Sequence, residues 1–179
     1  MAHSSGKKPV WRNKMIRTKR LIIKPLSDMD KTALVEILRN EKVSATYLTP
    51  DLKLDETAEK LFNRIKELSY MPDRFACGIY IDDKLIGIIN DTGIENGNVE
   101  IGYAIHPDHQ NKGYATEALK AVVEKLFEQG YAAVSAGIFE DNIASRRVLE
   151  KCGFVLIDKT EDIEYQSKMH HCIYFEVRR

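Results

Sequence analysis

The segment Gln110-Asn111-Lys112-Gly113-Tyr114-Ala115 decides the fold, because it lies between two stretches with different hydrophobic periods. Residues 99–105 before it alternate strictly between two faces, which predicts a strand. Residues 114–129 after it carry apolar side chains at helical spacing, and Gly130 suits the left-handed residue that ends a helix. A polar turn with a glycine therefore leads from a strand into the start of a long helix.

The position of this turn indicates an anion site. The first N–H groups of a helix have no acceptor within the helix, and the helix dipole places about half a positive charge there. Both favour a phosphate or pyrophosphate, and Gly113 lets such a group approach the backbone closely. The turn lacks the Gly-Lys-Ser/Thr ending of a P-loop and the three glycines of a dinucleotide-binding turn. A pyrophosphate-bearing ligand of another kind is expected, unless the turn binds nothing, as many such turns do.

The same six residues resemble the pyrophosphate-binding signature of the GNAT acetyltransferases, which is Gln or Arg, two residues, Gly, one residue, then Gly or Ala. Residues 142–145 (N-I-A-S), followed after seven residues by Gly153-Phe154, resemble the second GNAT motif. T-K-R-L-I-I-K-P-L at 18–26 and E-I-G-Y-A-I-H-P at 100–107 resemble the branch of the ribosomal-protein N-terminal acetyltransferases. The resemblance spans roughly residues 17–177 of the chain.

The fold that the resemblance implies is α/β (α+β): a mixed, mostly antiparallel, twisted sheet of about seven strands with flanking helices. Its fourth and fifth strands splay apart in a V, where acetyl-CoA enters. The hydrophobic pattern independently predicts seven strands, at 20–26, 75–81, 85–90, 99–105, 133–139, 154–157 and 173–177. It predicts helices over 27–39, from a cap at Asp55 to Pro72, over 114–129 and over 142–152. An irregular stretch is expected over 43–50, and an acidic loop with Glu161, Asp162 and Glu164 before the last strand.

The resemblance also implies which residues bind acetyl-CoA, the expected co-substrate. The backbone of Tyr103, Ala104 and Ile105 would bind the acyl and pantetheine groups. The pyrophosphate would lie on Gln110, Asn111, Lys112, Gly113, Tyr114 and Ala115. Asn142 and Ser145 share a helix face, so one could bind the pantetheine arm and the other the sulfur, while Arg147 or Lys151 could reach the ribose phosphate. Asn142 could instead serve only as the cap of its own helix.

Acetyl transfer to an amine requires removal of a proton from the ammonium form. Glu100, just before the expected acyl site, is the candidate base, acting through water, and Ser145 is the candidate acid for the departing thiolate. Tyr174 is a reserve acid. Glu100 could alternatively be a solvated carboxylate on a half-exposed strand.

Length and composition place limits on the remaining possibilities. The 179 residues suit one domain, which we expect over 15–179, after an N-terminal extension or cloning remnant over 1–14. Lys plus Arg and Asp plus Glu number 27 each, so no overall field favours nucleic acid or an anionic membrane. Three scattered cysteines indicate a reducing compartment, the cytoplasm. His106 with His109, and His170-His171 near Cys172, lack further ligands at recognisable spacing, so no metal is expected.

The sequence thus predicts an acetyl-CoA-dependent N-acetyltransferase, as a monomer or homodimer, whose acceptor is a primary amine. A protein or peptide N-terminal α-amine is favoured by the branch resemblance alone. A polyamine, an aminoglycoside or an amino acid is the alternative acceptor, and a non-catalytic acyl-CoA-binding module is the alternative function. A nucleic-acid-binding protein, suggested by the basic residues between Lys7 and Arg20, is disfavoured by the neutral chain.

Overall fold

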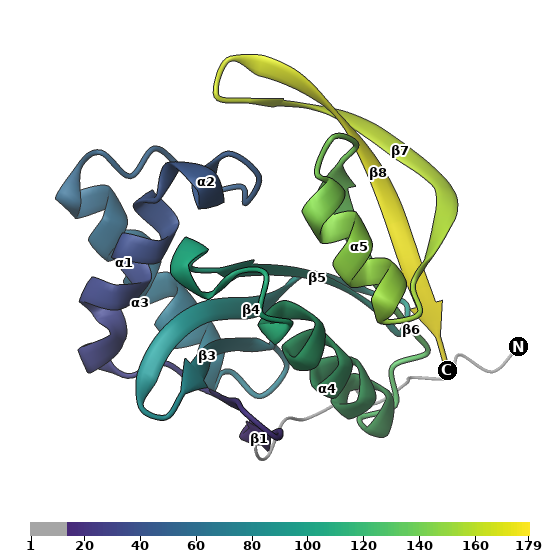
Figure 1. Cartoon of the computed structure of the whole chain (residues 1–179), viewed down its shortest axis with the longest axis horizontal. Helices are drawn as coiled ribbons and strands as arrows, with labels where there is room; N and C mark the ends of the chain where they lie inside the picture. Colours follow the sequence, from purple (N-terminus) through teal and green to yellow (C-terminus); the bar gives the residue numbers. More distant parts are fainter. Residues whose placement is uncertain (1–13) are drawn as a thin grey trace, which may run out of the picture.

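The computed structural model describes residues 14–179, which form one open sheet with helices on both faces (Figure 1). Its spatial strand order is β1-β2-β3-β4-β5-β6-β8-β7. The strands are β1 (Ile16–Arg17), β2 (Ile22–Lys24), β3 (Ala76–Ile81), β4 (Lys84–Glu95), β5 (Asn98–Ile105), β6 (Ala133–Phe139), β7 (Val155–Tyr165) and β8 (Lys168–Arg178). The helices are α1 (Lys31–Arg39), α2 (Glu41–Ser44), α3 (Asp55–Tyr70), α4 (Tyr114–Glu128) and α5 (Ile143–Lys151), with 3-10 turns at Asp28–Asp30 and Pro107–His109.

The predicted GNAT fold is confirmed, with one strand more than expected. The additional strand is β1, whose two residues are too short to give a hydrophobic pattern. Two tight hairpins join β3 to β4 and β4 to β5, and in the second turn Asn96 and Gly97 both adopt positive φ. Ser27 and Asp30 form a capping box at the start of the helix that was predicted over 27–39.

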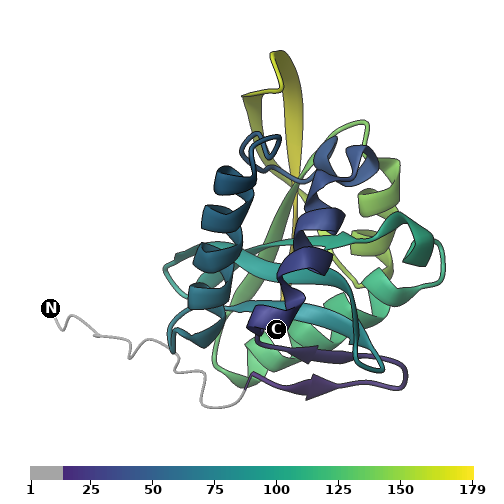
Figure 2. The ribbon, with the colours of Figure 1, turned by 90° about the vertical axis from the view of Figure 1, so that its left-hand side faces the viewer.

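Each face of the sheet has its own hydrophobic core, which lies between the strands and the helices that cover that face. On one face, α1 and α3 cover β2 to β5 (Figure 2). They pack on the sheet through residues such as Leu34, Phe62 and Ile88. On the other face, α4 packs through Leu119 and Val122, and α5 through Leu149. The strict alternation of β5 explains this arrangement, because Val99, Ile101 and Ile105 join the second core while Ala104 joins the first.

The sheet opens between β5 and β6, which is its one parallel pair among residues 14–179. Only Asn98 to Glu100 pair with β6, and Glu100 opposite Ser135 is the last pair. Beyond Glu100, β5 continues for five residues with no partner on that side. This is the V-shaped splay that the family resemblance predicts between the fourth and fifth strands. Those two strands are labelled β5 and β6 here because the additional strand β1 precedes them.

The C-terminal hairpin differs from the prediction. Glu161, Asp162 and Glu164 lie within β7 and pair with β8, so the predicted acidic loop is wrong. The reversal occurs at Gln166 and Ser167, both with positive φ. Charged residues are tolerated here because β7 is an edge strand with one exposed side. The tip of the hairpin reaches α2, where Tyr165 Oη donates to the Ser44 carbonyl at 2.7 Å.

Three smaller predictions also change. Leu54, not Asp55, precedes the first residue of α3, and the Asp55 carboxylate pairs with Arg39 at 2.7 Å. The start of the segment predicted as irregular belongs to α2, which Asn40 caps by accepting from the Lys42 N–H. Lys14, assigned to the extension, is buried and donates to the carbonyls of Leu68, Ser69 and Met71 at the end of α3. Residues 1–13 of the predicted extension lie outside the described residues.

Candidate active site

The free edge of β5 presents backbone groups to the splay. Successive strand residues direct their N–H groups to opposite edges, and the His106 N–H donates to Ile86 on the β4 side. The N–H groups of Tyr103 and Ile105 therefore face the splay. The Ile105 carbonyl also faces it and accepts from Gln110 Nε2 at 2.9 Å. Gln110 therefore closes the end of the free edge with its side chain.

The predicted anion-binding turn has the backbone that such a site requires. Asn111 and Gly113 adopt positive φ, 59° and 81°, just before the first turn of α4. Within residues 14–179, the N–H groups of Asn111, Lys112 and Gly113 donate to no protein acceptor. The first helical turn adds N–H groups without intrahelical acceptors. The Lys112 side chain donates to the Asp108 carbonyl at 2.7 Å.

An ion pair that the sequence analysis missed fixes this turn. Arg20 Nε donates to Glu117 Oε2 at 2.7 Å, and Arg20 Nη1 donates to the Lys112 carbonyl at 2.9 Å. The Arg20 guanidinium also lies 4.5 Å from the centre of the Tyr114 ring. Burial acts to raise the pKa of Glu117, but hydrogen bonds from Thr18 and Arg20 outweigh it and hold that pKa below its ordinary value. The segment before β2 therefore braces the N-terminus of α4.

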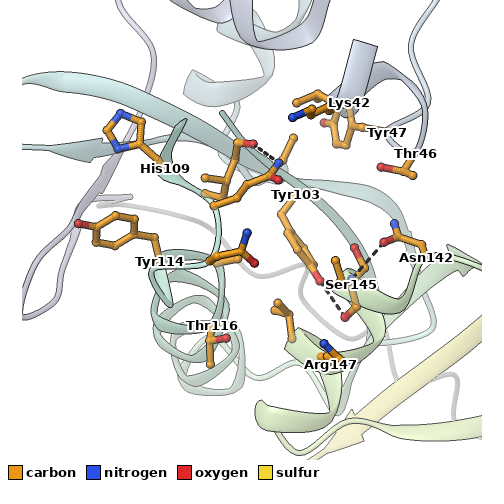
Figure 3. A pocket seen from close by; sticks show the side chains of 18 of the residues that line it. Lys42, Thr46, Tyr47, Tyr103, His109, Tyr114, Thr116, Asn142, Ser145 and Arg147 are labelled. Carbon is orange, nitrogen blue, oxygen red and sulfur yellow. Dashed lines mark hydrogen bonds between the residues drawn. The ribbon is translucent and has the colours of Figure 1, made fainter. Parts of the chain in front are cut away.

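A cleft of about 500 Å³ joins the splay to this turn (Figure 3). It brings together twelve of the predicted cofactor-binding residues: Tyr103, Ala104, Ile105, Gln110, Asn111, Gly113, Tyr114, Ala115, Asn142, Ser145, Arg147 and Lys151. Lys112 and Glu100, which were also predicted, are not among the lining residues. The residues not predicted are Lys42, Val43, Thr46, Tyr47, His109, Thr116, Ile143, Ala144 and Val148. Ile143 and Ala144 belong to the N-I-A-S motif, although no role was assigned to them. Lys42 and Val43 come from α2, where no sequence signal indicated a site.

Helix α5 forms one wall of the cleft and presents Ser145. Asn142 Oδ1 accepts from the Ser145 N–H at 3.1 Å, which is the capping role left open by the sequence. Tyr103 Oη donates to the Ser145 carbonyl at 3.3 Å, so β5 and α5 are joined across the cleft (Figure 3). Burial raises the pKa of Tyr103 well above its usual value, and its hydroxyl stays protonated.

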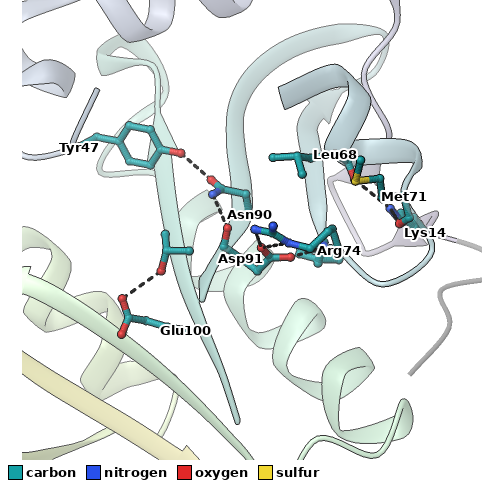
Figure 4. A network of polar contacts seen from close by, with 10 residues as sticks. Lys14, Tyr47, Leu68, Met71, Arg74, Asn90, Asp91 and Glu100 are labelled. Atoms are coloured by element: carbon teal, nitrogen blue, oxygen red, sulfur yellow. Dashed lines mark hydrogen bonds and ion pairs between the residues drawn. The ribbon is translucent and has the colours of Figure 1, made fainter. Parts of the chain in front are cut away.

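Glu100 lies beside the cleft, on the face of β5 opposite Tyr103. Its carboxylate accepts from Thr92 Oγ1 at 3.0 Å (Figure 4). The same carboxylate lies 3.4 Å from Lys159 Nζ. Gly102 separates Thr92 from Tyr47, because a Cβ placed on Gly102 would lie 3.3 Å from Thr92 and 3.5 Å from Tyr47. Tyr47 lines the cleft, whereas Glu100 and Thr92 do not.

Tyr47 and Tyr174 stand on the same side of the sheet as Glu100. Tyr47 Oη donates to Asn90 Oδ1 at 2.5 Å, and burial raises its pKa well above the ordinary value. Tyr174 Oη donates to Glu161 at 2.9 Å; burial, this hydrogen bond and the nearby Glu100 carboxylate raise the pKa of Tyr174. Tyr174 does not line the cleft, and its hydroxyl is a poor proton donor, so the structure does not favour it as a reserve acid.

The family is decided by sequence comparison. The sequence model of the acetyltransferase (GNAT) domain matches residues 20–155, more than half of the chain. The chain belongs to the GNAT acetyltransferase family. It is accordingly an acyl-CoA-dependent acetyltransferase.

Individual relatives of this GNAT enzyme are bacterial. N-acetyltransferase YoaA of Bacillus subtilis is 31% identical over 145 residues, which make up 78% of this chain and 82% of YoaA. The ribosomal-protein-serine acetyltransferase of Escherichia coli is 32% identical over 83 residues, 44% of this chain and 45% of that protein. The structure of RimL, a ribosomal L7/L12 α-N-protein acetyltransferase, in complex with coenzyme A aligns with a TM-score of 0.75 at 19% identity, covering 92% of this chain and 97% of that one. This last similarity concerns the fold alone.

The residues of the cleft fit acetyl-CoA, the co-substrate of the GNAT family. The unpartnered N–H groups of the turn suit a pyrophosphate, and the free β5 edge suits the amides of a pantetheine arm. Lys42, Arg147 and Lys151 line the cleft, and all three are exposed. Among residues 14–179, none of the three forms an ion pair with a protein carboxylate, so their charges can meet phosphate.

Other potentially reactive side chains do not form a second centre. The described residues contain no group of three or more His, Cys, Asp or Glu side chains able to hold a metal ion. Cys77, Cys152 and Cys172 are free thiols, and burial raises the pKa of Cys77 to about 12 and of Cys152 to about 11. Cys152 Sγ lies 3.6 Å from the Thr116 carbonyl, as expected for a packed side chain. None of the described helices has the length and apolar character of a membrane span.

Proposed function

We propose that this GNAT enzyme transfers acetyl from acetyl-CoA to the α-amine of a protein or peptide N-terminus. The observation on which the proposal depends is the position of Glu100 at the last paired residue before the splay. A carboxylate there is adjacent to the free strand edge on which an acyl group would lie. It is also on the opposite face from the α4 and α5 side of the cleft, so the amine and the co-substrate would approach from different sides.

The cleft residues have distinct roles in binding the co-substrate under this proposal. The backbone of residues 110–115 binds the pyrophosphate, and Arg147 or Lys151 binds the ribose phosphate. The backbone of residues 103–105 extends the sheet by binding the pantetheine amides and the acyl oxygen. Asn142 contributes by capping α5, which fixes the position of Ser145.

Proton transfers complete the mechanism. Glu100 accepts a proton from the ammonium group, either directly or through one water molecule, which frees the nitrogen lone pair to attack the thioester carbon. The N–H of Tyr103 or Ile105 stabilises the negative oxygen that forms. The attacking nitrogen is positively charged in the tetrahedral intermediate and loses its second proton to solvent as the carbon–sulfur bond breaks. Ser145 donates its hydroxyl proton to the departing thiolate and regains one from solvent. The products are an N-acetyl amide and CoA with a free thiol, and no covalent enzyme intermediate is needed.

The choice of acceptor depends on the relatives. Two of them carry ribosomal-protein acetyltransferase names, the Escherichia coli protein above and the ribosomal N-acetyltransferase YdaF of Bacillus subtilis, which is 32% identical over 99 residues. Strands β6, β8 and β7 form the part of the sheet beside Glu100. The tip of the β7–β8 hairpin contacts α2 through the hydrogen bond from Tyr165 to the Ser44 carbonyl. Small amines remain the second candidate acceptor.

We also propose a reducing compartment, the cytoplasm, as the location of the enzyme, which agrees with the three free thiols.

A thiol-release screen with acetyl-CoA tests the function. The acceptors are peptides with a free N-terminus and blocked lysines, polyamines, aminoglycosides and free amino acids. We expect CoA release above the acceptor-free rate with the peptides. Release only with a small amine would move the function to the second candidate, and tight CoA binding without release for any amine would favour a binding module.

A further inference from the structure

A bulge in β7 directs Lys159 toward Glu100. Leu156 pairs with Phe175 and Thr160 pairs with Ile173, so residues 157–159 lie opposite the single residue Tyr174. Extra residues of this kind bend a strand and change the direction in which its side chains point, often next to active sites. Lys159 is thereby turned onto the face of the sheet that carries Glu100.

The Lys159 ammonium occupies a position built for a cation. Its Nζ lies 3.4 Å from Glu100 Oε2 and 3.8 Å from the centre of the Tyr174 ring. That ring also packs against Gly137, where an added Cβ would lie 2.7 Å from the Tyr174 ring carbon Cε1. Thr92 Oγ1 donates a hydrogen bond to the other carboxylate oxygen of Glu100, Oε1. A carboxylate and an aromatic face together bind an ammonium group by charge and by cation–π attraction.

An acceptor amine needs this same position. Both α-amines and lysine side chains are mostly protonated near neutral pH, so the acceptor arrives as an ammonium ion. It must approach Glu100 to lose its proton if Glu100 is the base. We propose that Lys159 is an internal competitor of the acceptor, occupying the ammonium position beside Glu100 and Tyr174 until a cationic acceptor displaces it. This inference rests on the proposed function, in which Glu100 is the base.

The exposure of the pair makes this displacement feasible. The Lys159 side chain is 51% exposed and the Glu100 side chain 30% exposed. Ion pairs at this exposure are weak, and a lysine has a flexible stem that can leave without movement of the backbone. Competition of this type lowers the apparent affinity for the acceptor by the fraction of molecules in which the position is free. It also disfavours acceptor molecules that have no ammonium form, because they cannot replace the lost ion pair.

Variants of Lys159 test the competition through steady-state kinetics with a peptide that has a free α-amine. Lys159→Met should lower KM for the peptide by roughly three- to tenfold, with a smaller change in kcat. Lys159→Arg keeps the cation and should keep the parent KM. Lys168→Met is the matched control, because it removes the same charge at an exposed position of the same hairpin. An unchanged or higher KM in Lys159→Met, or an equal fall in Lys168→Met, would overturn the inference.

Chemical labelling of lysines gives a second test that does not depend on turnover. The full-length parent protein is acylated briefly with acetic anhydride in tetramethylammonium chloride or in sodium chloride at the same ionic strength, and labelling is located by mass spectrometry. Tetramethylammonium cannot be acylated, and it should raise labelling of Lys159 but not of Lys168. Equal labelling of Lys159 in the two salts would contradict the inference. A parent that releases no thiol with any amine contradicts the proposed function instead, whatever the labelling shows.

Discussion

Arg20 and Glu117, which are 97 residues apart in the sequence, meet at 2.7 Å and join the segment before β2 to the first turn of α4. Glu117 also accepts from the Arg20 N–H at 2.9 Å and from Thr18 Oγ1 at 2.6 Å. The Arg20 side chain continues to the Lys112 carbonyl. The N-terminal end of the sheet therefore positions the turn that we expect to bind pyrophosphate.

This relationship makes stability depend on pH in a defined direction. The folded-state pKa of Glu117 is below its unfolded value, so the carboxylate stabilises the fold fully above the unfolded value, near 4.5, and this stabilisation is lost as pH falls through the folded pKa. Glu117→Gln should therefore lower the free energy of unfolding by about 1 kcal/mol at pH 7, and the difference from the parent should be smaller at pH 3. Urea denaturation at both pH values measures this.

Glu124→Gln is the control for that measurement, because Glu124 is exposed on the same helix. It should change the free energy of unfolding little at either pH. A deficit of Glu117→Gln that persists unchanged at pH 3 would mean that the loss comes from packing and not from the charged hydrogen bonds.

Gly113→Glu should abolish tight CoA binding. It places a negative charge and a side chain at the turn, where a Cβ on Gly113 would already lie 3.3 Å from Arg20 Nη2. We expect an affinity at least roughly a hundredfold lower by calorimetry, because the diphosphate meets repulsion in place of free N–H groups.

Gly97→Glu separates this effect from backbone strain. Gly97 has φ of 78°, close to the 81° of Gly113, and no atom lies within 4 Å of an added Cβ. Both variants should lose about 1 kcal/mol of stability from the strained φ. Only Gly113→Glu should lose CoA affinity; equal CoA binding by the two folded variants would show that the turn does not bind the pyrophosphate.

Glu100→Gln should reduce turnover more than co-substrate affinity. We expect kcat to fall by about a hundred- to ten-thousand-fold, the range for removal of a general base, with CoA affinity near the parent value. Stopped-assay kinetics across pH should also show loss of the acidic limb of the kcat/KM profile. Glu95→Gln, at an exposed position of β4, should retain parent activity. A parent-like acidic limb in Glu100→Gln would assign the proton transfer to another group.

The enzyme should prefer an α-amine to a lysine side chain. At neutral pH roughly a tenth of α-amines are already unprotonated, against well under a hundredth of lysine amines, so a carboxylate base has less work to do. Matched peptides, one with a free N-terminus and blocked lysine and one with the reverse, can be compared by kcat/KM and by mass spectrometry of the products. Faster acetylation of lysine would reverse the assignment of the acceptor.

The sequence by itself determined the elements whose signals are local. The alternation of residues 99–105 and the period of residues 114–129 depend only on neighbours along the chain, so β5 and α4 were predicted together with the turn between them. The two GNAT motifs then implied the family, and twelve of the predicted residues meet in one cleft. The hairpin β7–β8 was predicted too short because its charged, exposed outer half has no hydrophobic alternation to recognise.

Only the tertiary structure decided the partners of these residues. Glu100 meets Lys159 because a bulge in β7, which has no sequence signature, turns that side chain across the sheet. Arg20 meets Glu117, and Tyr47 enters the cleft, because packing of distant elements brings them there. Sequence periodicity specifies which face of an element is buried, but the identity of the residue opposite depends on strand register and layer packing, which involve the whole chain at once.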